Sequence, residues 1–409
     1  MKIAILTLGT RGDVQPYAVL GAALSEKGHI VTLSTAKNFE HLVRSFNLQF
    51  VAIEADFQEL LNSDEGKKMM KANPWAVKRN LHSWVYPLIS SSLTTFYQLA
   101  TENDLVLYHV KTLADSFADQ FPHKMIRTSL LPIVEPTSSF ANPALSGIPI
   151  PRFLNRMSYR LTQLSMRLLA KPIGQFRQQH KLPPLGTIPQ VRNIYGISPH
   201  FLAKPTDLMP NSLFTGFWFN TSTEDLSPDL LDFIKAGTPP LLVTFGSMPF
   251  KSKLNLEQAL TLLTKQLNIR LLVVKGWGLH AESFHHPNIK LIDSAPFDKL
   301  FPLTKAIVHH GGIGTTAECL RAGKPCFVCP VLYPVGDQQF WGNHIYTQGL
   351  GPKPIALSKL TEKSFVTSIE QLLNTPHYYT NAQEFMYQLK LEDGLQNAVN
   401  AIINKYHIK

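Results

Sequence analysis

Short apolar runs alternate with amphipathic stretches over the first half of the chain. The runs at residues 3–8, 30–34, 105–109 and 125–130 predict strands, and the spacing of apolar positions over residues 15–27 predicts a helix. Strands that alternate with helices are typical of a parallel sheet wrapped by helices. The first half therefore predicts an α/β domain.

The alternation stops in mid-chain and then restarts. Proline gathers in residues 199–210 and polar residues fill 220–227, a composition typical of a linker. New strands are predicted at 241–245, 269–274, 289–292 and 306–310. We therefore expect two Rossmann-like domains that face a cleft, over residues 1–205 and 228–409, joined by a linker at 206–227.

Each predicted domain begins with a strand that ends in a glycine followed by a hydroxyl residue. The first domain has Gly9-Thr10 and the second has Gly246-Ser247. Ligands of open parallel sheets bind beyond the carboxyl ends of the strands, which is where both turns lie. We therefore expect both turns to border a ligand site.

Residues 309–341 carry the most specific chemistry of the chain. A glycine-rich turn at 311–314 separates the last predicted strand from a predicted helix at 315–322. Glycines let backbone N–H groups approach a ligand closely, and a helix N-terminus adds unpaired N–H groups and the positive end of its dipole. This arrangement favours a diphosphate, with Thr315 and Thr316 as additional hydroxyl donors.

Polar residues suited to sugars follow in the same stretch. Glu318 lies one helical turn after the glycines, where its carboxylate can accept hydrogen bonds from ribose hydroxyls. Asp337 and Gln338 come after a further predicted strand at 326–330 and offer acceptors and donors for hexose hydroxyls. Together these residues predict a nucleotide-sugar site.

The same residues resemble the donor-binding motif of nucleotide-sugar-dependent glycosyltransferases of the GT-B type, which have two Rossmann-like domains. The Gly-Asp-Gln-x-Phe-Trp sequence at residues 336–341 is most similar to sterol glucosyltransferases and glycopeptide-antibiotic glycosyltransferases. Further similar motifs lie at residues 9–16, 182–184, 215–218 and 349–352. The resemblance also implies that the final helix, roughly residues 381–405, crosses back to the N-terminal domain.

The resemblance implies donor-binding roles for residues of the second domain. Ser247, His310 and Gly312 match positions that contact the diphosphate in this family. Trp277 and Phe297 follow successive predicted strands, where a uracil or thymine ring could stack. Aromatic residues after strands are equally typical of a core, so both interpretations of this pair stay open.

Asp13 is the candidate catalytic base. Glycosyl transfer needs a group that takes the proton of the acceptor hydroxyl, and Asp13 follows the glycine turn of the first predicted strand. The sterol and antibiotic branch of the family resembles this chain in having aspartate at this position. The alternative is that Asp13 only caps the helix that begins near residue 15. The sequence identifies no residue that orients Asp13.

We expect catalysis without a metal ion. The chain has no two aspartates separated by a single residue, the usual ligand pair for a metal-bound diphosphate. The glycine turn and His310 are then expected to stabilise the charge of the leaving diphosphate. No cofactor is expected beyond the co-substrate, a UDP-sugar and by preference UDP-glucose.

The three cysteines, Cys319, Cys326 and Cys329, fit a reducing compartment. Cys326 and Cys329 have half of a metal motif, but no second pair exists and their spacing directs them to opposite faces of a strand. Packing is therefore expected for them, and His309 is likewise interpreted as a packed residue at a strand end.

Composition places the chain among ordinary globular proteins. It has 409 residues, 44% of them hydrophobic, which favours two to three domains with large cores. The first apolar run is too short for a signal-peptide core, and no apolar stretch is long enough to span a bilayer. We therefore expect a cytoplasmic protein, with a peripheral membrane contact as a further possibility.

That possibility comes from residues 136–206, which contain no Asp or Glu but nine Lys and Arg, nearly all of the formal net charge of +10. Five of these bases recur at helical spacing: Arg152, Arg156, Arg160, Arg167 and Lys171. Phe153, Met157, Leu161, Leu164 and Leu168 form the opposite stripe. Such a helix either binds an anionic membrane or packs by its apolar side with its bases in solvent. Nucleic acid is not favoured, because no aromatic side chains interleave the bases.

The sequence thus predicts an inverting, metal-independent glycosyltransferase that moves a hexose to a hydroxyl of a hydrophobic acceptor such as a sterol or other lipid. One alternative acceptor is an antibiotic or other natural-product aglycone, with a UDP- or dTDP-sugar as donor. Gly312-x-Gly314-x-x-Ala317 also matches a dinucleotide-dependent oxidoreductase, but the following strand lacks the expected acid. A non-catalytic lipid-binding module is disfavoured because four polar site residues are intact: Asp13, Glu318, Asp337 and Gln338.

Overall fold

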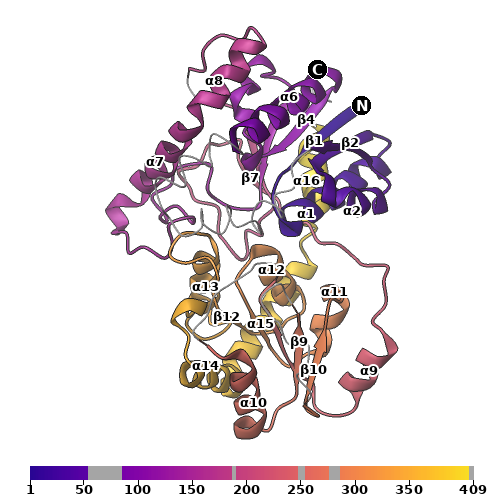
Figure 1. Cartoon of the computed structure of the whole chain (residues 1–409), viewed down its shortest axis with the longest axis vertical. Coiled ribbons are helices and arrows are strands. Elements are labelled where there is room, and N and C mark those ends of the chain that lie inside the picture. The colour runs from indigo at the N-terminus through magenta and orange to yellow at the C-terminus, as the bar shows by residue number, and fades with distance from the viewer. Residues whose placement is uncertain (54–84, 187–189, 247–253, 276–285, 405–409) are drawn as a thin grey trace.

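The chain folds into two α/β domains stacked along the long axis of the molecule (Figure 1). The computed structural model describes residues 1–53, 85–186, 190–246, 254–275 and 286–404, apart from the side chains of six residues, 161–166. The predicted two Rossmann-like domains are confirmed.

A seven-stranded sheet, parallel throughout, forms the centre of the N-terminal domain. Its order is β3-β2-β1-β4-β5-β6-β7. The strands are β1 (Lys2–Leu6), β2 (Ile30–Ala36), β3 (Gln49–Ile53), β4 (Leu105–His109), β5 (Met125–Ser129), β6 (Arg192–Tyr195) and β7 (Leu213–Phe214). Leu6 pairs with Tyr108, so the carboxyl ends of β1 and β4 lie side by side.

Helices cover this sheet on both faces and extend beyond it. They are α1 (Arg11–Glu26), α2 (Glu40–Ser45), α6 (Tyr86–Glu102), α7 (Asn155–Ser165) and α8 (Ala170–Gln179). Short 3-10 turns include η3 (Val110–Thr112), η6 (Arg152–Leu154) and η7 (Met166–Leu169). Among the described residues, no helix combines the length and apolar character that crossing a bilayer requires.

The C-terminal domain has a five-stranded parallel sheet in the order β10-β9-β8-β11-β12. The strands are β8 (Leu241–Thr244), β9 (Leu271–Val274), β10 (Ile289–Ile292), β11 (Ile307–His309) and β12 (Cys326–Val328). The helices are α9 (Pro228–Lys235), α10 (Leu256–Leu267), α11 (Phe297–Leu300), α12 (Ile313–Arg321), α13 (Gln338–Thr347), α14 (Glu362–Asn374) and α15 (Pro376–Lys390). The central strands are buried apolar runs, as expected for a sheet covered on both faces.

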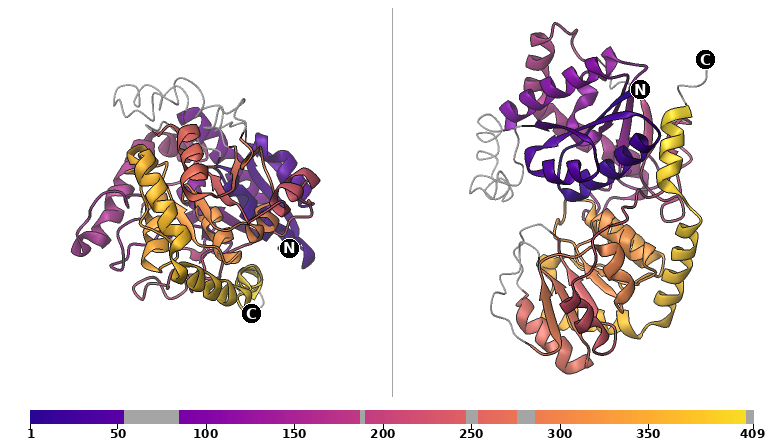
Figure 2. Two further views of the ribbon diagram at one scale, coloured as in Figure 1. Left: turned by 90° about the horizontal axis from the view of Figure 1, so that it is seen from below. Right: turned by 90° about the vertical axis from the view of Figure 1, so that its right-hand side faces the viewer.

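The last helix, α16 (Gly394–Ile403), crosses back and packs on the N-terminal domain beside α1 (Figure 2). Val399 and Ile402 are buried in the core of that domain. The sequence predicted one helix over 381–405, whereas the structure has a break between α15 and α16. The break has a physical cause, because the Asp393 side chain caps α16 by accepting a hydrogen bond from Gln396 N (2.9 Å).

The linker is shorter than predicted. Residues 206–227 were predicted to be the linker, but β7 lies within this range and pairs with β6 through Leu213 and Phe214. β7 has only two residues and follows a proline-rich passage, so the sequence pattern did not predict it. The connection between the domains therefore runs from residue 215 to the start of α9 at Pro228.

A backbone bridge joins the two domains. Gly147 N donates to Pro334 O (3.1 Å), and Gly336 N donates to Ala144 O (2.8 Å). Ser146 Oγ also donates to Gly336 O (3.1 Å). The bridge, defined as residues 144–147 and 334–336, therefore connects the N-terminal domain to the loop that immediately precedes Asp337.

Candidate active site

The candidate base, Asp13, lies in the first turn of α1. The N-cap of α1 is Thr10, and Asp13 Oδ2 accepts hydrogen bonds from Thr10 N (2.9 Å) and Thr10 Oγ1 (3.2 Å). Thr10 is therefore the N-cap of α1, which begins four residues earlier than expected, and Asp13 at the third helical position completes a capping box with it. The capping role that the sequence left open is present, and it leaves the role of Asp13 as a base a prediction. A Cβ on Gly9 would lie 2.2 Å from Asp13 Oδ2, so glycine is required for this placement.

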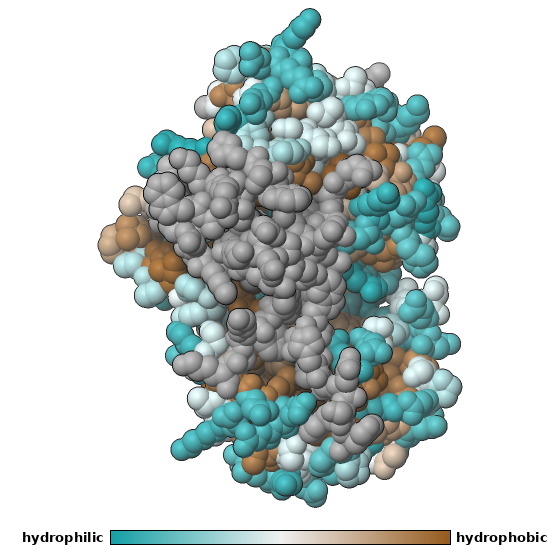
Figure 3. All heavy atoms as spheres, in the orientation of Figure 1, coloured by the Kyte–Doolittle hydropathy of each residue, from teal (hydrophilic) through white to brown (hydrophobic). Residues whose placement is uncertain are grey.

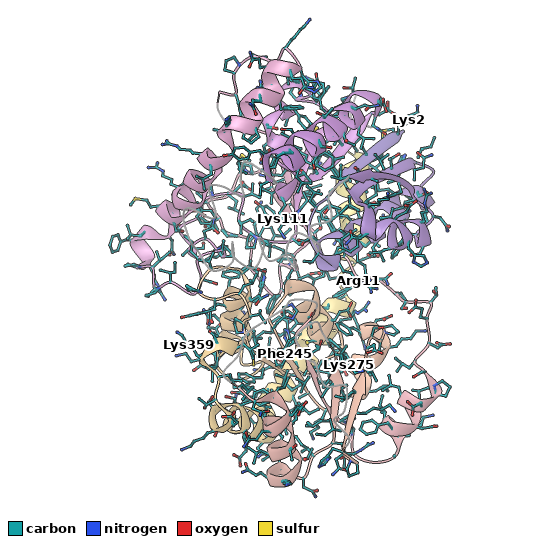
Figure 4. All side chains as sticks on the ribbon, in the orientation of Figure 1. Lys2, Arg11, Lys111, Phe245, Lys275 and Lys359 are labelled. Carbon is teal, nitrogen blue, oxygen red and sulfur yellow. The ribbon has the colours of Figure 1, made fainter. Side chains whose placement is uncertain are left out.

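Lys111 is the residue that holds Asp13 from a second side. Its Nζ lies 2.6 Å from Asp13 Oδ1. Lys111 belongs to η3, directly after β4, and β4 is the neighbour of β1 in the sheet. It lies where the N-terminal domain faces the other domain (Figure 4). The sequence analysis missed this residue, which fixes the orientation of the carboxylate.

The surroundings of Asp13 keep its carboxylate ionised. Burial raises the pKa of Asp13, but Lys111 and then His109 lower it, and the net pKa lies below the usual 3.8. His109 is fully buried behind Asp13, and burial lowers the pKa of its imidazole to about 4. At neutral pH the first domain therefore presents a carboxylate paired with the Lys111 ammonium and backed by an uncharged imidazole.

On the other side of the junction, His310 lies between two glycine turns. A Cβ on Gly246 would lie 2.9 Å from His310 Cε1, and a Cβ on Gly312 would lie 2.6 Å from His310 Nε2. Both glycines therefore make room for the ring. Burial, and then His309, lower the pKa of His310 to about 3, so the ring is neutral at physiological pH. A neutral imidazole offers one N–H donor but no positive charge.

The glycine turn leads into α12, as the sequence predicted, with Gly312 as its N-cap. The unpaired N–H groups of the first turn give α12 the donor set expected for an anion. Thr315 is half-buried in that turn. Thr316 differs from the prediction, because it is fully buried and its hydroxyl donates to Gly312 O (3.0 Å). Its single proton is therefore used within the helix rather than directed at a phosphate.

Glu318 forms an ion pair within α12. Its Oε2 accepts from Arg321 Nε (2.8 Å) and lies 2.6 Å from Arg321 NH2. Both contacts use the same oxygen, so a ribose hydroxyl could still approach Oε1. Burial raises the pKa of Glu318 to about 7, although Arg321 lowers it. The predicted ribose-binding residue is therefore a carboxyl group that titrates near neutral pH.

The two predicted hexose-binding residues differ in their surroundings. Gln338 is buried, and its Oε1 accepts hydrogen bonds from Val331 N (2.7 Å) and Leu332 N (2.8 Å). The amide oxygen of Gln338 is therefore used by the loop backbone, which differs from the predicted role of this oxygen as an acceptor for a hexose hydroxyl. Asp337 Oδ2 accepts from Trp341 Nε1 (3.0 Å), which sets the direction of the carboxylate.

Charged residues of the N-terminal domain also shift the pKa of Asp337. Burial raises its pKa, Lys111 lowers it, and Asp13 raises it further. Charges of the N-terminal domain therefore act on an acid of the C-terminal domain, and we refer to Asp13, Lys111 and Asp337 as the charge cluster at the domain junction. The candidate base and a predicted sugar-binding residue are thus coupled electrostatically.

Of the two residues predicted to stack on the base of the donor, the structure describes Phe297. Phe297 begins α11 and stacks on Phe301 with ring centroids 4.5 Å apart, and it borders the core of the domain. This packing matches the core interpretation that the sequence left open. Ser247 and Trp277 lie outside the described residues.

Among the described residues, one group of three side chains could hold a metal ion. The ligand atoms of His309, Cys319 and Cys326 lie within 4.8 Å of one another, and all three residues are buried. Gly311 N donates to His309 Nδ1 (3.1 Å), which places the ring proton on Nε2. Cys319 lowers the pKa of Cys326 through a hydrogen bond, burial raises it, and His309 lowers it further. His309 Nε2 itself has no hydrogen-bond partner within the described residues. Cys326 and Cys329 pack into different cores on opposite faces of the sheet, as the sequence predicted.

Comparison with known proteins bears on this site directly. Residues 3–118 match the glycosyltransferase family 28 N-terminal domain, and residues 280–399 match the erythromycin biosynthesis protein CIII-like C-terminal domain. A sterol 3-beta-glucosyltransferase of Arabidopsis thaliana is 30% identical over 98% of this chain and 67% of its own length. The chain belongs to the GT-B glycosyltransferases. A nucleotide-sugar donor and a small-molecule acceptor are consistent with this family.

The relatives of this GT-B glycosyltransferase fall into two groups. The O-mycaminosyltylonolide 6-deoxyallosyltransferase of Streptomyces fradiae is 28% identical over 97% of this chain and 96% of its own length. The solved structure of the kitacinnamycin glycosyltransferase matches with a TM-score of 0.74 at 16% identity, over 99% of this chain and 98% of that one. Sterol and antibiotic glycosyltransferases are thus both similar to it, as predicted.

Proposed function

We propose that this glycosyltransferase moves glucose from UDP-glucose to a hydroxyl of a hydrophobic acceptor such as a sterol or other lipid. The observation that carries the proposal is the ionised Asp13, which Lys111 and Thr10 hold in place and whose charge acts on Asp337 of the other domain. The similarity to the plant sterol glucosyltransferase over 98% of the chain supports the choice of sugar and acceptor class. The proposal includes a cytoplasmic location with a peripheral contact to membrane, where a lipid acceptor resides.

In the proposed reaction the acceptor oxygen attacks the anomeric carbon of glucose while Asp13 takes its proton. The bond between that carbon and the diphosphate breaks at the same time, and UDP leaves with the electron pair. Attack from the face opposite the leaving group inverts the anomeric carbon. Lys111 and Thr10 hold the Asp13 carboxylate in place, and its remaining lone pairs can accept the proton.

Metal independence gives the first test of this chemistry. The first-turn N–H groups of α12 and the neutral His310 are proposed to stabilise the leaving diphosphate in place of a cation. We expect turnover of UDP-glucose to stay unchanged in a strong chelator such as EDTA. Loss of turnover in EDTA, restored by manganese or magnesium, would overturn this part of the mechanism.

Two substitutions test which part of the donor each acid binds. Losing a hydrogen bond to a charged group costs about 1.5–3 kcal/mol, so Glu318→Ala should weaken UDP and UDP-glucose alike by roughly tenfold or more, through the ribose. Asp337→Ala should spare UDP and weaken UDP-glucose only. Isothermal calorimetry with both ligands measures the two effects. Equal losses for UDP and UDP-glucose in the Asp337 variant would exclude its contact with the hexose.

The raised pKa of Glu318 adds a pH dependence to donor binding. The group is half protonated near its pKa of about 7, and the carboxylate is the better acceptor for two ribose hydroxyls. Affinity for UDP-glucose should therefore rise as the pH increases through neutrality, and Glu318→Gln should abolish that rise. UDP-glucose is the right ligand, because it lacks the terminal phosphate ionisation of UDP.

A natural-product aglycone is the second candidate acceptor, supported by the similarity to the O-mycaminosyltylonolide 6-deoxyallosyltransferase of Streptomyces fradiae over 97% of the chain. One assay separates the two candidates. The protein is incubated with UDP-glucose or dTDP-glucose as donor and with a sterol or a macrolide aglycone as acceptor. The masses of the products are then measured by mass spectrometry. We expect a hexose increment on the sterol with UDP-glucose. An increment only on the aglycone would replace the lipid acceptor in the proposal.

A further inference from the structure

The segment around α7 has an unusual distribution of apolar side chains. Within the described part of the chain, Phe153 is 84% exposed, Leu168 56%, Met157 53% and Ile148 42%. These four are among eleven large hydrophobic residues with such exposure, and the other seven are spread over the rest of the described residues. Single exposed apolar residues are ordinary, whereas four of them within 21 positions of one segment point to a candidate contact surface.

The inward side of the same segment is polar. Asn155 Nδ2 donates to Ser138 O (2.9 Å), and Ser158 Oγ accepts from Asn142 N (2.8 Å). Tyr159 is buried, and its hydroxyl donates to Pro132 O (3.2 Å). A helix of a soluble domain normally turns its apolar side inward. Among the side chains of α7 that the structure describes, those of Asn155, Ser158 and Tyr159 are buried, while Met157 is exposed. The side chains of Leu161 and Leu164 lie outside the described residues.

This arrangement corrects the sequence analysis. The sequence placed Phe153, Met157 and Leu168 on a stripe opposite the bases, and one interpretation packed that stripe against the protein. The structure instead exposes these apolar residues together with the bases. Figure 3 shows hydrophobic and hydrophilic residues side by side on this projecting part of the N-terminal domain, where Figure 1 places α7.

The charge around the apolar residues is almost entirely positive. Arg152, Arg160 and Arg167 are exposed and make no ion pair within the described residues. Arg156 has one acidic neighbour, Asp207, at the long distance of 3.7 Å, and its side chain is 66% exposed. Lys171 is also exposed. The surface therefore combines large apolar side chains with bases that are available to an anionic partner.

We propose that Ile148, Phe153, Met157 and Leu168, with Arg152, Arg156, Arg160, Arg167 and Lys171, form a docking surface for an anionic lipid bilayer. Apolar side chains next to a set of bases are what a helix needs to lie in a membrane interface, with the bases at the headgroups. A protein partner would need a matching acidic and apolar patch. A second copy of this chain would place the same bases against one another.

The docking surface stands apart from the donor site and belongs to the domain that carries Asp13. It continues along the chain into the bridge, since Ile148 directly follows Gly147, which donates to Pro334 O. A lipid acceptor leaving the bilayer would therefore enter beside the domain junction. This last step rests on the proposed function, whereas the docking itself does not.

Co-sedimentation with vesicles tests the proposal. The wild-type protein should sediment with phosphatidylcholine vesicles that contain phosphatidylglycerol and stay in solution with phosphatidylcholine alone. Two variants should each lose more than tenfold in affinity for these vesicles. One is Phe153→Ser/Met157→Ser, and the other is Arg152→Glu/Arg160→Glu/Arg167→Glu. Leu391→Ser is the matched control, because Leu391 is 91% exposed but lies between α15 and α16. It should bind like wild type.

The outcomes separate docking from catalysis. Both variants should keep wild-type turnover of UDP-glucose with an acceptor dispersed in detergent, since none of the changed residues contacts the charge cluster at the junction. Wild-type protein that fails to bind anionic vesicles, or that binds neutral ones equally, overturns the docking surface. Dimers that the Phe153→Ser/Met157→Ser variant abolishes, without vesicle binding, would assign the surface to a second copy. Vesicle binding without sterol glucosylation would overturn the proposed acceptor and leave the docking surface intact.

Discussion

Asp13→Asn is expected to lower turnover about 10²- to 10⁴-fold, because general base catalysis contributes about that much and an amide cannot take the acceptor proton. The amide keeps the size of the side chain, so the contact with Thr10 and the start of α1 should survive. The affinity for UDP-glucose should change little. Steady-state kinetics and calorimetry on the same preparation measure both quantities. Near-normal turnover in this variant would exclude Asp13 as the base.

Lys111 provides the companion variant. Burial raises the pKa of Asp13 and Lys111 lowers it, so Lys111→Met should let the pKa of Asp13 rise. The carboxylate form is then lost at a higher pH, and the acid limb of the profile of kcat/KM against pH should move upward. Lys111→Arg keeps the charge and should restore the wild-type limb. An acid limb that stays in place would show that Lys111 does not act through Asp13.

His310→Ala is expected to lower kcat about 10²- to 10³-fold, the usual cost of removing one donor that stabilises charge developing in the transition state. The ring fits between Gly246 and Gly312, so its N–H is held in place before the reaction begins. The assay is turnover of UDP-glucose at saturating acceptor. His310→Gln, which offers a side-chain N–H in a similar position, should recover part of the rate.

The pH dependence of this variant tests the protonation state of His310. With a pKa of about 3 the wild-type ring is neutral throughout the physiological range. The ratio of wild-type to His310→Ala rates should therefore be constant between about pH 6 and pH 8. A ratio that grows as the pH falls would mean that the imidazolium is the active form.

Buried apolar runs made the central strands predictable. The predicted strands at 105–109 and 241–245 match β4 and, within one residue, β8, because such runs favour the interior of a parallel sheet. The analysis did not predict β3 or β6. β6 begins with Arg192 and Asn193 and has no continuous apolar run, so its pairing with β5 rather than its composition makes it a strand. β3 has a run of four apolar residues at 50–53, but it is an edge strand whose residues are mostly only half-buried.

The site was predictable where backbone geometry determines it. The glycine turn before α12 and the position of Asp13 follow from local sequence, and the structure has both. Lys111 carried one indirect signal: in a doubly wound sheet the residue after the fourth strand lies beside the end of the first. The contacts of Thr316 and Gln338 could not be predicted, because they depend on which backbone groups come within reach of each side chain.

The return of α16 to the N-terminal domain has a consequence for synthesis. Val399 and Ile402 complete a core that also contains Val14 and Leu20 of α1, yet they are translated after the whole second domain. The first domain to leave the ribosome therefore lacks part of its interior until the last helix is made. Domains usually fold one after another as they are translated. In this chain the N-terminal domain therefore completes its core only after the C-terminal domain has been synthesised.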